Sequence, residues 1–387
     1  MGASRGGGVK VFVVAGEASG DRLGAALMAG LRSLREVEFH GIGGAQMQAQ
    51  GLDSLFPMED LSVMGLAEIV PRYSHLRQRL GQTVQAVLED DPDLLITIDS
   101  PDFCLRVARR VKARRNIRTV HYVAPSVWAW RAGRAAKMAQ VIDHVLALLP
   151  FEPPLMEAAG MACDFVGHPV VAEPQPTAQE VAGFRARHGL SDQPLLMVLP
   201  GSRRGEVTRL APVFGEAMAQ VAKARPGMRL VLPTTAQMAP LVREAVAGWA
   251  VAPLILAPDS PDFAKEKACA FCAADWALAA SGTVSLELAA SDTPMVIAYD
   301  MTWLSRVILS RMLRVDTVTL VNLVSETRAV PEFIGRACRA ERIAPALLAL
   351  MQNPGTQRAA MRLTMERLGR GGEAPGLRAA RAVLARL

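Results

Sequence analysis

The feature that most constrains this chain is an alternation of short, β-branched apolar runs with amphipathic helical segments. Continuous apolar runs are typical of strands in a parallel sheet that is covered on both faces. The series occurs twice, so the sequence predicts two doubly wound α/β domains. The predicted strands are Val9–Ala15, Leu94–Ile98, Thr119–Val123 and Val145–Leu149, followed by Leu195–Leu199, Leu230–Pro233, Leu254–Ala257, Trp276–Ala280 and Met295–Ala298.

A proline-rich stretch divides the two series. Residues 167–176 read Gly-His-Pro-Val-Val-Ala-Glu-Pro-Gln-Pro, which is typical of a stiff connector. With 387 residues, 51% of them hydrophobic, the chain can form two cores. We expect an N-terminal domain over residues 1–170, a C-terminal domain over 171–355 and a helical segment over 356–387. That segment would pack on the first domain or on another subunit, which leaves a homodimer open.

Composition limits the compartment and the partners. No stretch reaches the roughly 18 apolar residues of a membrane-spanning helix, and the run Val11–Ala15 is too short for a signal-peptide core, so we expect a cytoplasmic protein. The net charge of +6 with 5% aromatic residues favours phosphorylated substrates or an anionic membrane surface over nucleic acid. Five scattered cysteines, including the pair Cys269 and Cys272, lack a second metal-binding pair and are expected to be reduced core residues.

Ligands of open α/β sheets bind beyond the carboxyl ends of the strands, so the loops at these ends are candidate sites. The first loop is Gly16-Glu17-Ala18-Ser19-Gly20-Asp21, whose glycines allow a close approach of the backbone to a ligand. The alternative is an ordinary turn in which Ser19 or Asp21 caps the next helix. The candidates for sugar or acceptor binding in this loop are Gly16, Glu17, Ser19 and Asp21.

A carboxylate, Asp99, follows the predicted strand Leu94–Ile98 and is the candidate general base, whereas Asp102 is expected to cap a helix. The sequence Asp91-Pro92-Asp93 resembles a metal-binding D-x-D, but it precedes its strand and therefore lies at the wrong end of the sheet. A third loop, His121–Arg131, combines a histidine, two tryptophans and an arginine. It favours contact with a sugar or acyl chain, with core packing of the tryptophans as the alternative. Its candidates are His121, Ser126, Trp128 and Arg131.

Two loops of the second half are suited to a nucleotide diphosphate. Pro200-Gly201-Ser202-Arg203 offers backbone amides and a guanidinium group, and Ser281-Gly282-Thr283 offers amides and hydroxyls at a helix N-terminus. Glu287 lies one turn further and can accept hydrogen bonds from ribose. Either loop alone could be a helix cap, but both in one domain favour a nucleotide site. The candidates are Ser202, Arg203, Ser281, Gly282, Thr283 and Glu287.

The order of these motifs resembles the lipid-A-disaccharide synthase family. The shared motifs are Gly16–Asp21, Ile98–Phe103, His121–Arg131, Leu149-Pro150-Phe151-Glu152, Gly167-His168-Pro169, Leu199–Arg203 and Ser281–Glu287. The resemblance implies a GT-B fold, with two Rossmann-like domains that face a central cleft, and no cofactor or metal. Cys104 departs from the family pattern, in which an asparagine follows the Asp-Phe pair.

The resemblance also implies an activity. A member of this family is an inverting glycosyltransferase that joins UDP-2,3-diacylglucosamine to 2,3-diacylglucosamine 1-phosphate (lipid X), forming the β-1′,6-linked lipid A disaccharide 1-phosphate and UDP. It implies that Asp99 is the base, that Arg203 and the Ser281–Glu287 loop hold UDP, and that Asn322 lines the cleft.

Substrates with acyl chains require contact with a bilayer. Residues 64–80 carry apolar side chains at helical spacing beside Arg72, Arg77 and Arg79, which is typical of an interfacial helix. A buried amphipathic helix is the alternative, and Trp303–Arg314 is a second candidate. We expect peripheral contact with the cytoplasmic face of the inner membrane. The candidate contact residues are Leu66, Ile69, Val70, Tyr73 and Leu76.

Three other functions remain as alternatives. A UDP-N-acetylglucosamine 2-epimerase or another GT-B transferase would share the fold and the UDP site. A dinucleotide-dependent oxidoreductase is disfavoured, because the chain lacks G-x-G-x-x-G and an acidic residue about 20 positions further on. A two-lobed solute-binding protein would need a signal peptide.

Overall fold

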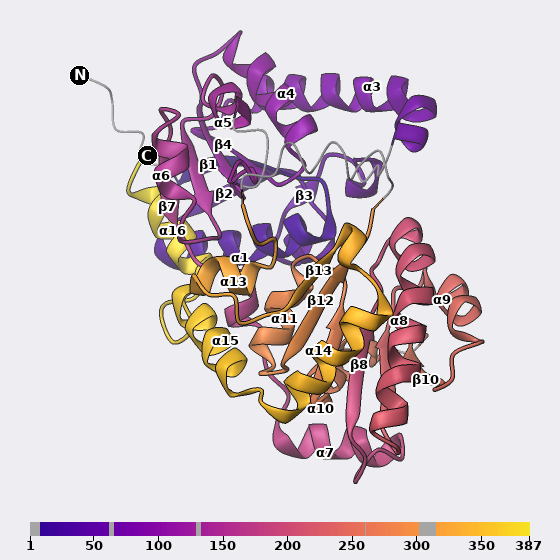
Figure 1. The fold of residues 1–387 in the computed structure, drawn as a ribbon. Helices are drawn as coiled ribbons and strands as arrows, with labels where there is room; N and C mark the ends of the chain where they lie inside the picture. The colour runs from indigo at the N-terminus through magenta and orange to yellow at the C-terminus, as the bar shows by residue number, and fades with distance from the viewer. Residues whose placement is uncertain (1–7, 62–65, 129–132, 260, 302–314) are drawn as a thin grey trace. The chain divides into compact units, whose positions relative to one another are not determined.

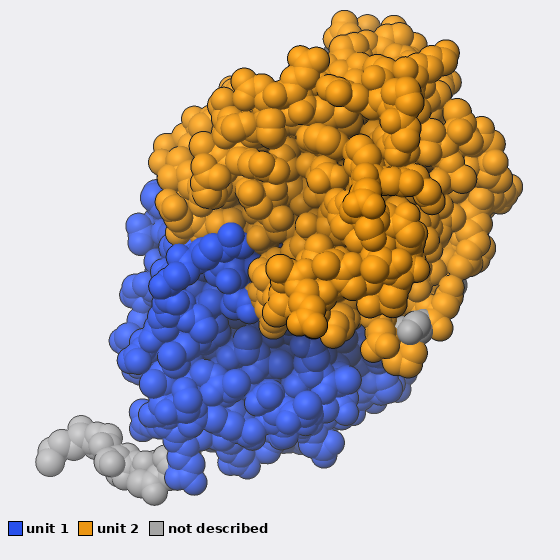
Figure 2. Space-filling view, turned by 90° about the horizontal axis from the view of Figure 1, so that it is seen from below, with its two compact units in different colours: residues 1–172, 368–387 blue, residues 173–367 orange. Residues whose placement is uncertain are grey.

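The computed structural model describes residues 8–61, 66–128, 133–259, 261–301 and 315–387; for residues 66–73 it describes the helix but not the side chains. The chain forms two compact units, residues 1–172 with 368–387 (unit 1) and residues 173–367 (unit 2), which are shown in two colours in Figure 2. Both units consist of a parallel sheet and helices (Figure 1).

Unit 1 contains a seven-stranded parallel sheet with the order β3-β2-β1-β4-β5-β6-β7. Its strands are β1 (Val9–Ala15), β2 (Val37–Ile42), β3 (Asp53–Ser54), β4 (Leu94–Ile98), β5 (Arg118–Tyr122), β6 (His144–Ala147) and β7 (Ala162–Phe165). All five residues of β4 are buried, as expected for a strand with both faces covered. The order reverses between β1 and β4, which is where ligands bind in doubly wound sheets.

The helices of unit 1 come from both ends of the chain. They are α1 (Ala18–Leu34), α2 (Ala45–Ala49), η1 (Met58–Asp60), α3 (Leu66–Asp90), α4 (Pro101–Lys112), α5 (Gly133–Met138), α6 (Pro153–Glu157), η2 (Pro169–Ala172) and α16 (Pro375–Leu384). The last of these, α16, packs against α1. A Cβ atom on Gly30 would lie 2.6 Å from the carbonyl oxygen of Gly376, so glycine permits the close approach of the two helices.

Unit 2 repeats this plan with a six-stranded parallel sheet in the order β10-β9-β8-β11-β12-β13. Its strands are β8 (Leu195–Leu199), β9 (Arg229–Pro233), β10 (Pro253–Leu256), β11 (Trp276–Ala279), β12 (Met295–Tyr299) and β13 (Glu332–Ile334). Its helices are α7 (Ala178–Arg187), α8 (Arg204–Ala224), α9 (Ala239–Val246), α10 (Phe263–Ala273), α11 (Val284–Ala290), α13 (Leu320–Ser325), η3 (Gly335–Ala337), α14 (Ala340–Gln352) and α15 (Gly355–Arg367). Side chains of β8, β11, α8 and α14 form a shared core.

The predicted fold class is confirmed: each unit is a doubly wound α/β domain with the strand order of a Rossmann-like fold. All nine predicted strands are present, with ends that agree within two residues. The structure adds β2, β3, β7 and β13, which the pattern of apolar runs did not reveal. None of the five cysteines, all of which lie in the described part of the chain, forms a disulfide, and four of them are buried. Among the described residues, no helix is long and apolar enough to cross a membrane.

Candidate functional site

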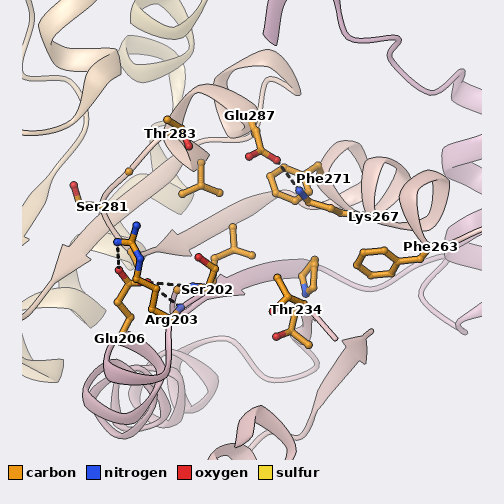
Figure 3. Close-up of a pocket in the computed structure, with 17 residues that line it drawn as sticks. Ser202, Arg203, Glu206, Thr234, Phe263, Lys267, Phe271, Ser281, Thr283 and Glu287 are labelled. Carbon is orange, nitrogen blue, oxygen red and sulfur yellow. Dashed lines mark hydrogen bonds and ion pairs between the residues drawn. The ribbon is translucent and has the colours of Figure 1, made fainter. Parts of the chain in front are cut away.

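A cavity of about 500 Å³ lies in unit 2 at the carboxyl ends of β8, β9 and β11 (Figure 3). The cavity brings together all six residues that the sequence assigned to a nucleotide: Ser202, Arg203, Ser281, Gly282, Thr283 and Glu287. Further residues from the loop after β9 and from α10 line the cavity, including Thr234, Phe263, Lys267 and Phe271. The two loops therefore belong to one concave site, which neither loop establishes alone.

The loop after β8 differs from the prediction in its use of backbone amides. The amides of Ser202 and Arg203 donate to Oε2 of Glu206, at 3.1 and 3.3 Å, so the carboxylate occupies the donors that were expected to bind a diphosphate. A Cβ atom on Gly201, whose φ is +109°, would lie 2.5 Å from the same oxygen, which explains the glycine. The guanidinium group of Arg203 lies 3.4 Å from Oε1 of Glu206, and 67% of the arginine side chain is exposed. That guanidinium group can therefore contact an anion, whereas the two amides already have a partner.

Glu287 is held by a neighbouring helix. Its Oε2 atom lies 2.8 Å from Nζ of Lys267, and this ammonium group also lies 5.2 Å from the ring centroid of Phe271. The turn before it is closed by the hydroxyl of Ser285, which donates to the carbonyl of Gly282 at 3.0 Å. Sequence reasoning missed the cavity residues of α10 because that helix precedes β11 and does not belong to a loop at a strand end. A signal existed in the four-residue spacing of Phe263, Lys267 and Phe271.

In unit 1, Asp99 lies at the carboxyl end of β4, beside the loop after β1. The hydroxyl of Ser19 donates to Oδ2 of Asp99 at 3.4 Å, and a Cβ atom on Gly16 would lie 2.6 Å from Oγ of Ser100. Asp99 and Ser100 have φ angles of +51° and +41°, which residues other than glycine adopt rarely. Such backbone strain often occurs at functional sites. The structure therefore brings Gly16, Ser19 and Asp99 together where the strand order of unit 1 reverses.

The side chain of Asp21 has a different task from the one considered in the sequence. It is 4% exposed and accepts hydrogen bonds from the amides of Gly44, Gln46 and Met47, at 2.9, 2.9 and 3.0 Å. Asp21 therefore caps α2. The suggested capping of α1 by Ser19 or Asp21 is wrong, because the N-cap of α1 is Glu17 and no side-chain bond caps that helix. The cap expected of Asp102 is also wrong, since Ser100 is the N-cap of α4.

The loop after β5 is described up to Trp128, so Arg131 lies outside the described residues. Ser126 is exposed, and the ring of Trp128 packs edge-on against Phe151 with centroids 5.5 Å apart. His121 is buried, with Nδ1 2.8 Å from the hydroxyl of Thr97. Burial lowers the pKa of His121 to about 4, so its imidazole is neutral at pH 7.

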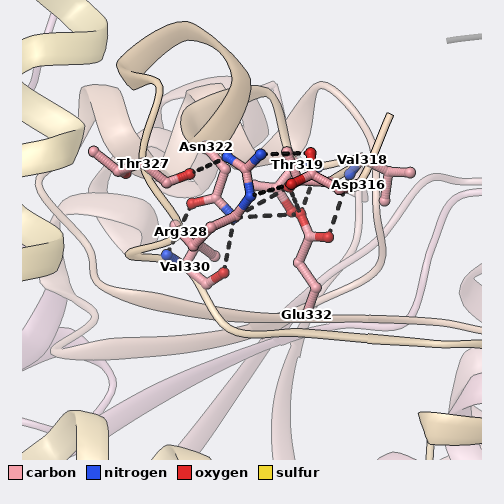
Figure 4. Close-up of polar contacts among 9 residues, drawn as sticks. Asp316, Val318, Thr319, Asn322, Thr327, Arg328, Val330 and Glu332 are labelled. Atoms are coloured by element: carbon pink, nitrogen blue, oxygen red, sulfur yellow. Dashed lines mark hydrogen bonds and ion pairs between the residues drawn. The ribbon is translucent and has the colours of Figure 1, made fainter. Parts of the chain in front are cut away.

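Asn322 lies in a polar network within unit 2 (Figure 4). Its side chain is 1% exposed, donates to the carbonyl of Val330 at 2.9 Å and accepts from the amide of the same residue at 2.9 Å. The amide nitrogen also donates to Thr317 at 3.2 Å. Asn322 does not line the cavity at the ends of β8, β9 and β11. These bonds connect α13 to the segment that leads into β13, which gives Asn322 a structural role.

Two predicted features are only partly described. The side chains of Leu66, Ile69, Val70 and Tyr73 lie outside the described residues, whereas Leu76 is partly buried against the core of unit 1. In the second candidate segment, residues 302–314 lie outside the described part as well. At the amino end of the unit 1 sheet, Asp93 accepts a hydrogen bond from the amide of Lys10 in β1, opposite to the ligand-binding end. The described residues contain no cluster of three or more potential metal ligands.

Comparisons with known proteins agree with these features. Residues 11–381 match the family model described as lipid-A-disaccharide synthetase. The lipid-A-disaccharide synthase of Ruegeria pomeroyi is 62% identical over 98% of this chain and 96% of its own length. The synthase of Rhodospirillum centenum is 48% identical over 97% and 94%, respectively.

Among solved structures, a UDP-GlcNAc 2-epimerase from Neisseria meningitidis bound to UDP-GlcNAc is similar. It aligns with a TM-score of 0.64 and 11% identity over 97% of this chain and 99% of its own. At that identity the likeness shows the fold alone.

Proposed function

Since this chain belongs to the lipid-A-disaccharide synthetase family, we propose how its residues divide the reaction of that family between them. The protein is an inverting glycosyltransferase of lipid A biosynthesis. It transfers 2,3-diacylglucosamine from UDP to the 6-hydroxyl of 2,3-diacylglucosamine 1-phosphate, releasing UDP and the β-1′,6-linked disaccharide 1-phosphate. The observation that carries the residue assignment is the cavity of unit 2, which gathers the six candidate nucleotide residues.

We assign the donor nucleotide to this cavity. Arg203 and the Ser281–Thr283 loop contact the diphosphate, and Glu287 accepts hydrogen bonds from the ribose. Negative charge grows on the diphosphate as UDP leaves, and donors that are already in place stabilise this charge without reorganisation. The amides of Ser202 and Arg203 already donate to Glu206, so they are not assigned to the diphosphate. The guanidinium group of Arg203 is exposed, which supports its assignment to the diphosphate.

We assign the acceptor to the strand ends of unit 1. Asp99 accepts the proton of the attacking hydroxyl. The loop residues Gly16, Glu17 and Ser19 contact the acceptor sugar. Two observations support this role: the hydrogen bond that the hydroxyl of Ser19 donates to Asp99, and the positive φ angle of Asp99. We further propose that Ser126, Trp128 and Arg131 contact the acceptor, whereas His121, buried and bonded to Thr97, supports their loop from within the sheet.

Because both substrates carry acyl chains, we propose peripheral contact with the cytoplasmic face of the inner membrane through the first part of α3. The contact residues are Leu66, Ile69, Val70 and Tyr73. Leu76, which was also a candidate, packs at the edge of the core of unit 1 and is therefore not assigned to the membrane contact.

A direct assay tests the function. Purified protein with UDP-2,3-diacylglucosamine and the 1-phosphate acceptor should release UDP and the disaccharide, and with UDP-N-acetylglucosamine alone it should form no 2-epimer. Arg203→Ala should weaken UDP binding about tenfold or more in calorimetry, because a charge-assisted hydrogen bond contributes about 1.5–3 kcal/mol. Arg204→Ala, next in the chain but absent from the cavity lining, is the control. Unchanged UDP affinity in Arg203→Ala would place the diphosphate elsewhere.

A further inference from the structure

The helix α10 presents three large side chains to the nucleotide cavity. Phe263, Lys267 and Phe271 follow one another at steps of four residues, so they share one face of the helix. All three line the cavity. Figure 3 shows them at the end near Thr234, whereas Ser281 and Arg203 lie at the other end. The cavity therefore has a guanidinium and hydroxyl end and an aromatic end.

The chemistry of a nucleoside diphosphate matches this order. The base and the diphosphate are attached to opposite sides of the ribose. With the diphosphate at Arg203 and the ribose at Glu287, the base reaches the end formed by α10. Phe263 is partly buried there and offers an aromatic ring. All nucleobases can stack on such rings, because every base has a π face.

Lys267 connects this end to Glu287. Its ammonium group lies 2.8 Å from Oε2 of Glu287 and is packed over the ring of the buried Phe271, so two contacts restrict the lysine. Glutamate side chains otherwise have several rotamers of similar energy, and ordering one on ligand binding costs entropy. The ion pair therefore orders the carboxylate before a ribose arrives.

We propose that α10 reads the nucleoside of the donor: Phe263 is the platform for the base, and Lys267 is a positioning residue that orients Glu287 toward the ribose hydroxyls. This inference rests on the proposed function, which places a uridine diphosphate in the cavity of unit 2. It adds that recognition of the base and the sugar of the nucleotide depends on α10 as well as on the segments that follow the strands.

The role of Lys267 is tested with Lys267→Met by comparing UDP with 2′-deoxyuridine diphosphate in calorimetry. UDP affinity should fall about tenfold and deoxyuridine diphosphate affinity much less, because the variant loses the oriented acceptor of the hydroxyl. Lys267→Arg should restore most of the difference, and in a Glu287→Gln background Lys267→Met should add little. Lys265→Met is the control, since Lys265 lies on the same helix, has an ion pair of 2.8 Å with Glu180 and is absent from the lining.

Equal losses for UDP, deoxyuridine diphosphate and pyrophosphate would overturn the positioning role, because Lys267 would then act as a charge on the phosphates. Unchanged UDP affinity would overturn it as well.

The platform is tested with Phe263→Leu, which keeps an apolar side chain and removes the ring. UDP affinity should fall about tenfold, while the affinity for ribose 5-diphosphate, which has no base, should stay the same. Equal effects on both ligands, or none on UDP, would overturn the platform. If the unaltered protein bound no UDP, the proposed nucleotide site itself would fail, so the two failures are distinguishable.

Discussion

At the scale of single residues, the backbone conformation of Asp99 determines which substitution can be used to test its role. The left-handed conformation at φ +51° is tolerated by asparagine better than by alanine, and asparagine keeps an oxygen for the amide of Ser100, which now donates to Asp99 at 2.9 Å. Asp99→Asn should therefore fold and lose the base. Turnover should fall about a hundredfold or more, while UDP affinity stays the same.

Steady-state kinetics and calorimetry on Asp99→Asn check this expectation, with Asp102→Asn as the control because Asp102 is exposed in the first turn of α4. Near-normal turnover in Asp99→Asn would transfer the base to another group of the same loops, such as Glu17.

Glu152 is a buried carboxyl group whose titration should be visible in the stability of the protein. It is 4% exposed, accepts a bond from the amide of Leu149 at 3.0 Å, and burial raises its pKa to about 7 from an ordinary value near 4.5. The unfolded chain therefore loses this proton near pH 4.5, and the folded protein retains it until about pH 7. The contribution of Glu152 to the free energy of unfolding is fully present below pH 4.5, decreases as the pH rises to about 7 and is constant above that pH. The total decrease is up to about 3 kcal/mol.

Urea unfolding at pH 5 and pH 8 measures this effect when the protein is compared with Glu152→Gln, which cannot ionise. The difference in unfolding free energy between the two proteins should shift in favour of the variant at pH 8. The comparison also cancels the contribution of His121, which is the same in both proteins. Because the pKa of His121 is lowered to about 4, that residue makes the free energy of unfolding fall as the pH drops below about 6.5. Parallel pH profiles would show that Glu152 ionises normally in the folded protein.

At the scale of elements, the described side chains of α3 limit where the proposed membrane contact can lie. Leu80 is 5% exposed and Leu76 packs at the edge of the core, so one face of the later turns packs in the core of unit 1. The membrane proposal is therefore confined to the earlier turns. Leu66→Ser with Ile69→Ser should leave the melting temperature nearly unchanged and lower sedimentation with vesicles that contain anionic lipid.

Leu80→Ala is the matched core control for α3 and should destabilise the protein by about 2–5 kcal/mol while folded molecules still bind vesicles. If the Leu66 and Ile69 variant unfolded as readily as Leu80→Ala, its two positions would be core and the docking surface would lie elsewhere.

Strand prediction succeeded or failed according to how much information a segment carries by itself. β4 and β8 consist of five buried residues each, all of them apolar except Thr97, and such runs are visible in the sequence alone. In β2, buried and exposed positions alternate at first and a histidine and a glycine follow, while β3 has two residues. These segments are strands because they pair with β1 and β2, so the neighbouring strand decides their conformation.

At the scale of the whole molecule, the chain crosses from unit 1 to unit 2 after residue 172 and returns at residue 368. The return depends on the contact of α16 with α1, where a Cβ atom on Gly376 would lie 2.6 Å from the carbonyl oxygen of Ala26. Gly376→Ala should force these helices apart and destabilise unit 1 by about 1–3 kcal/mol. Because the proposed nucleotide cavity belongs to unit 2, UDP affinity should not change.

Thermal and urea unfolding, followed with and without UDP, test the return contact. Gly372→Ala is the control, since Gly372 precedes α16 and its nearest neighbour would be 3.4 Å from an added Cβ atom. A stability equal to that of the control would mean that the two helices adapt to the methyl group without cost.

The sequence by itself determined the two doubly wound units, the strands with buried apolar runs, and the six residues at strand ends that line the cavity of unit 2. These features depend on local periodicity and on the rule that loops at the carboxyl ends of parallel strands share one edge. The tertiary structure alone decided that Glu206 occupies the amides after Gly201, that Asp21 caps α2, that one face of α10 lines the cavity and that α16 packs on α1. Each of these depends on which groups meet after packing, and the pattern along one segment carries no information about a partner elsewhere in the chain.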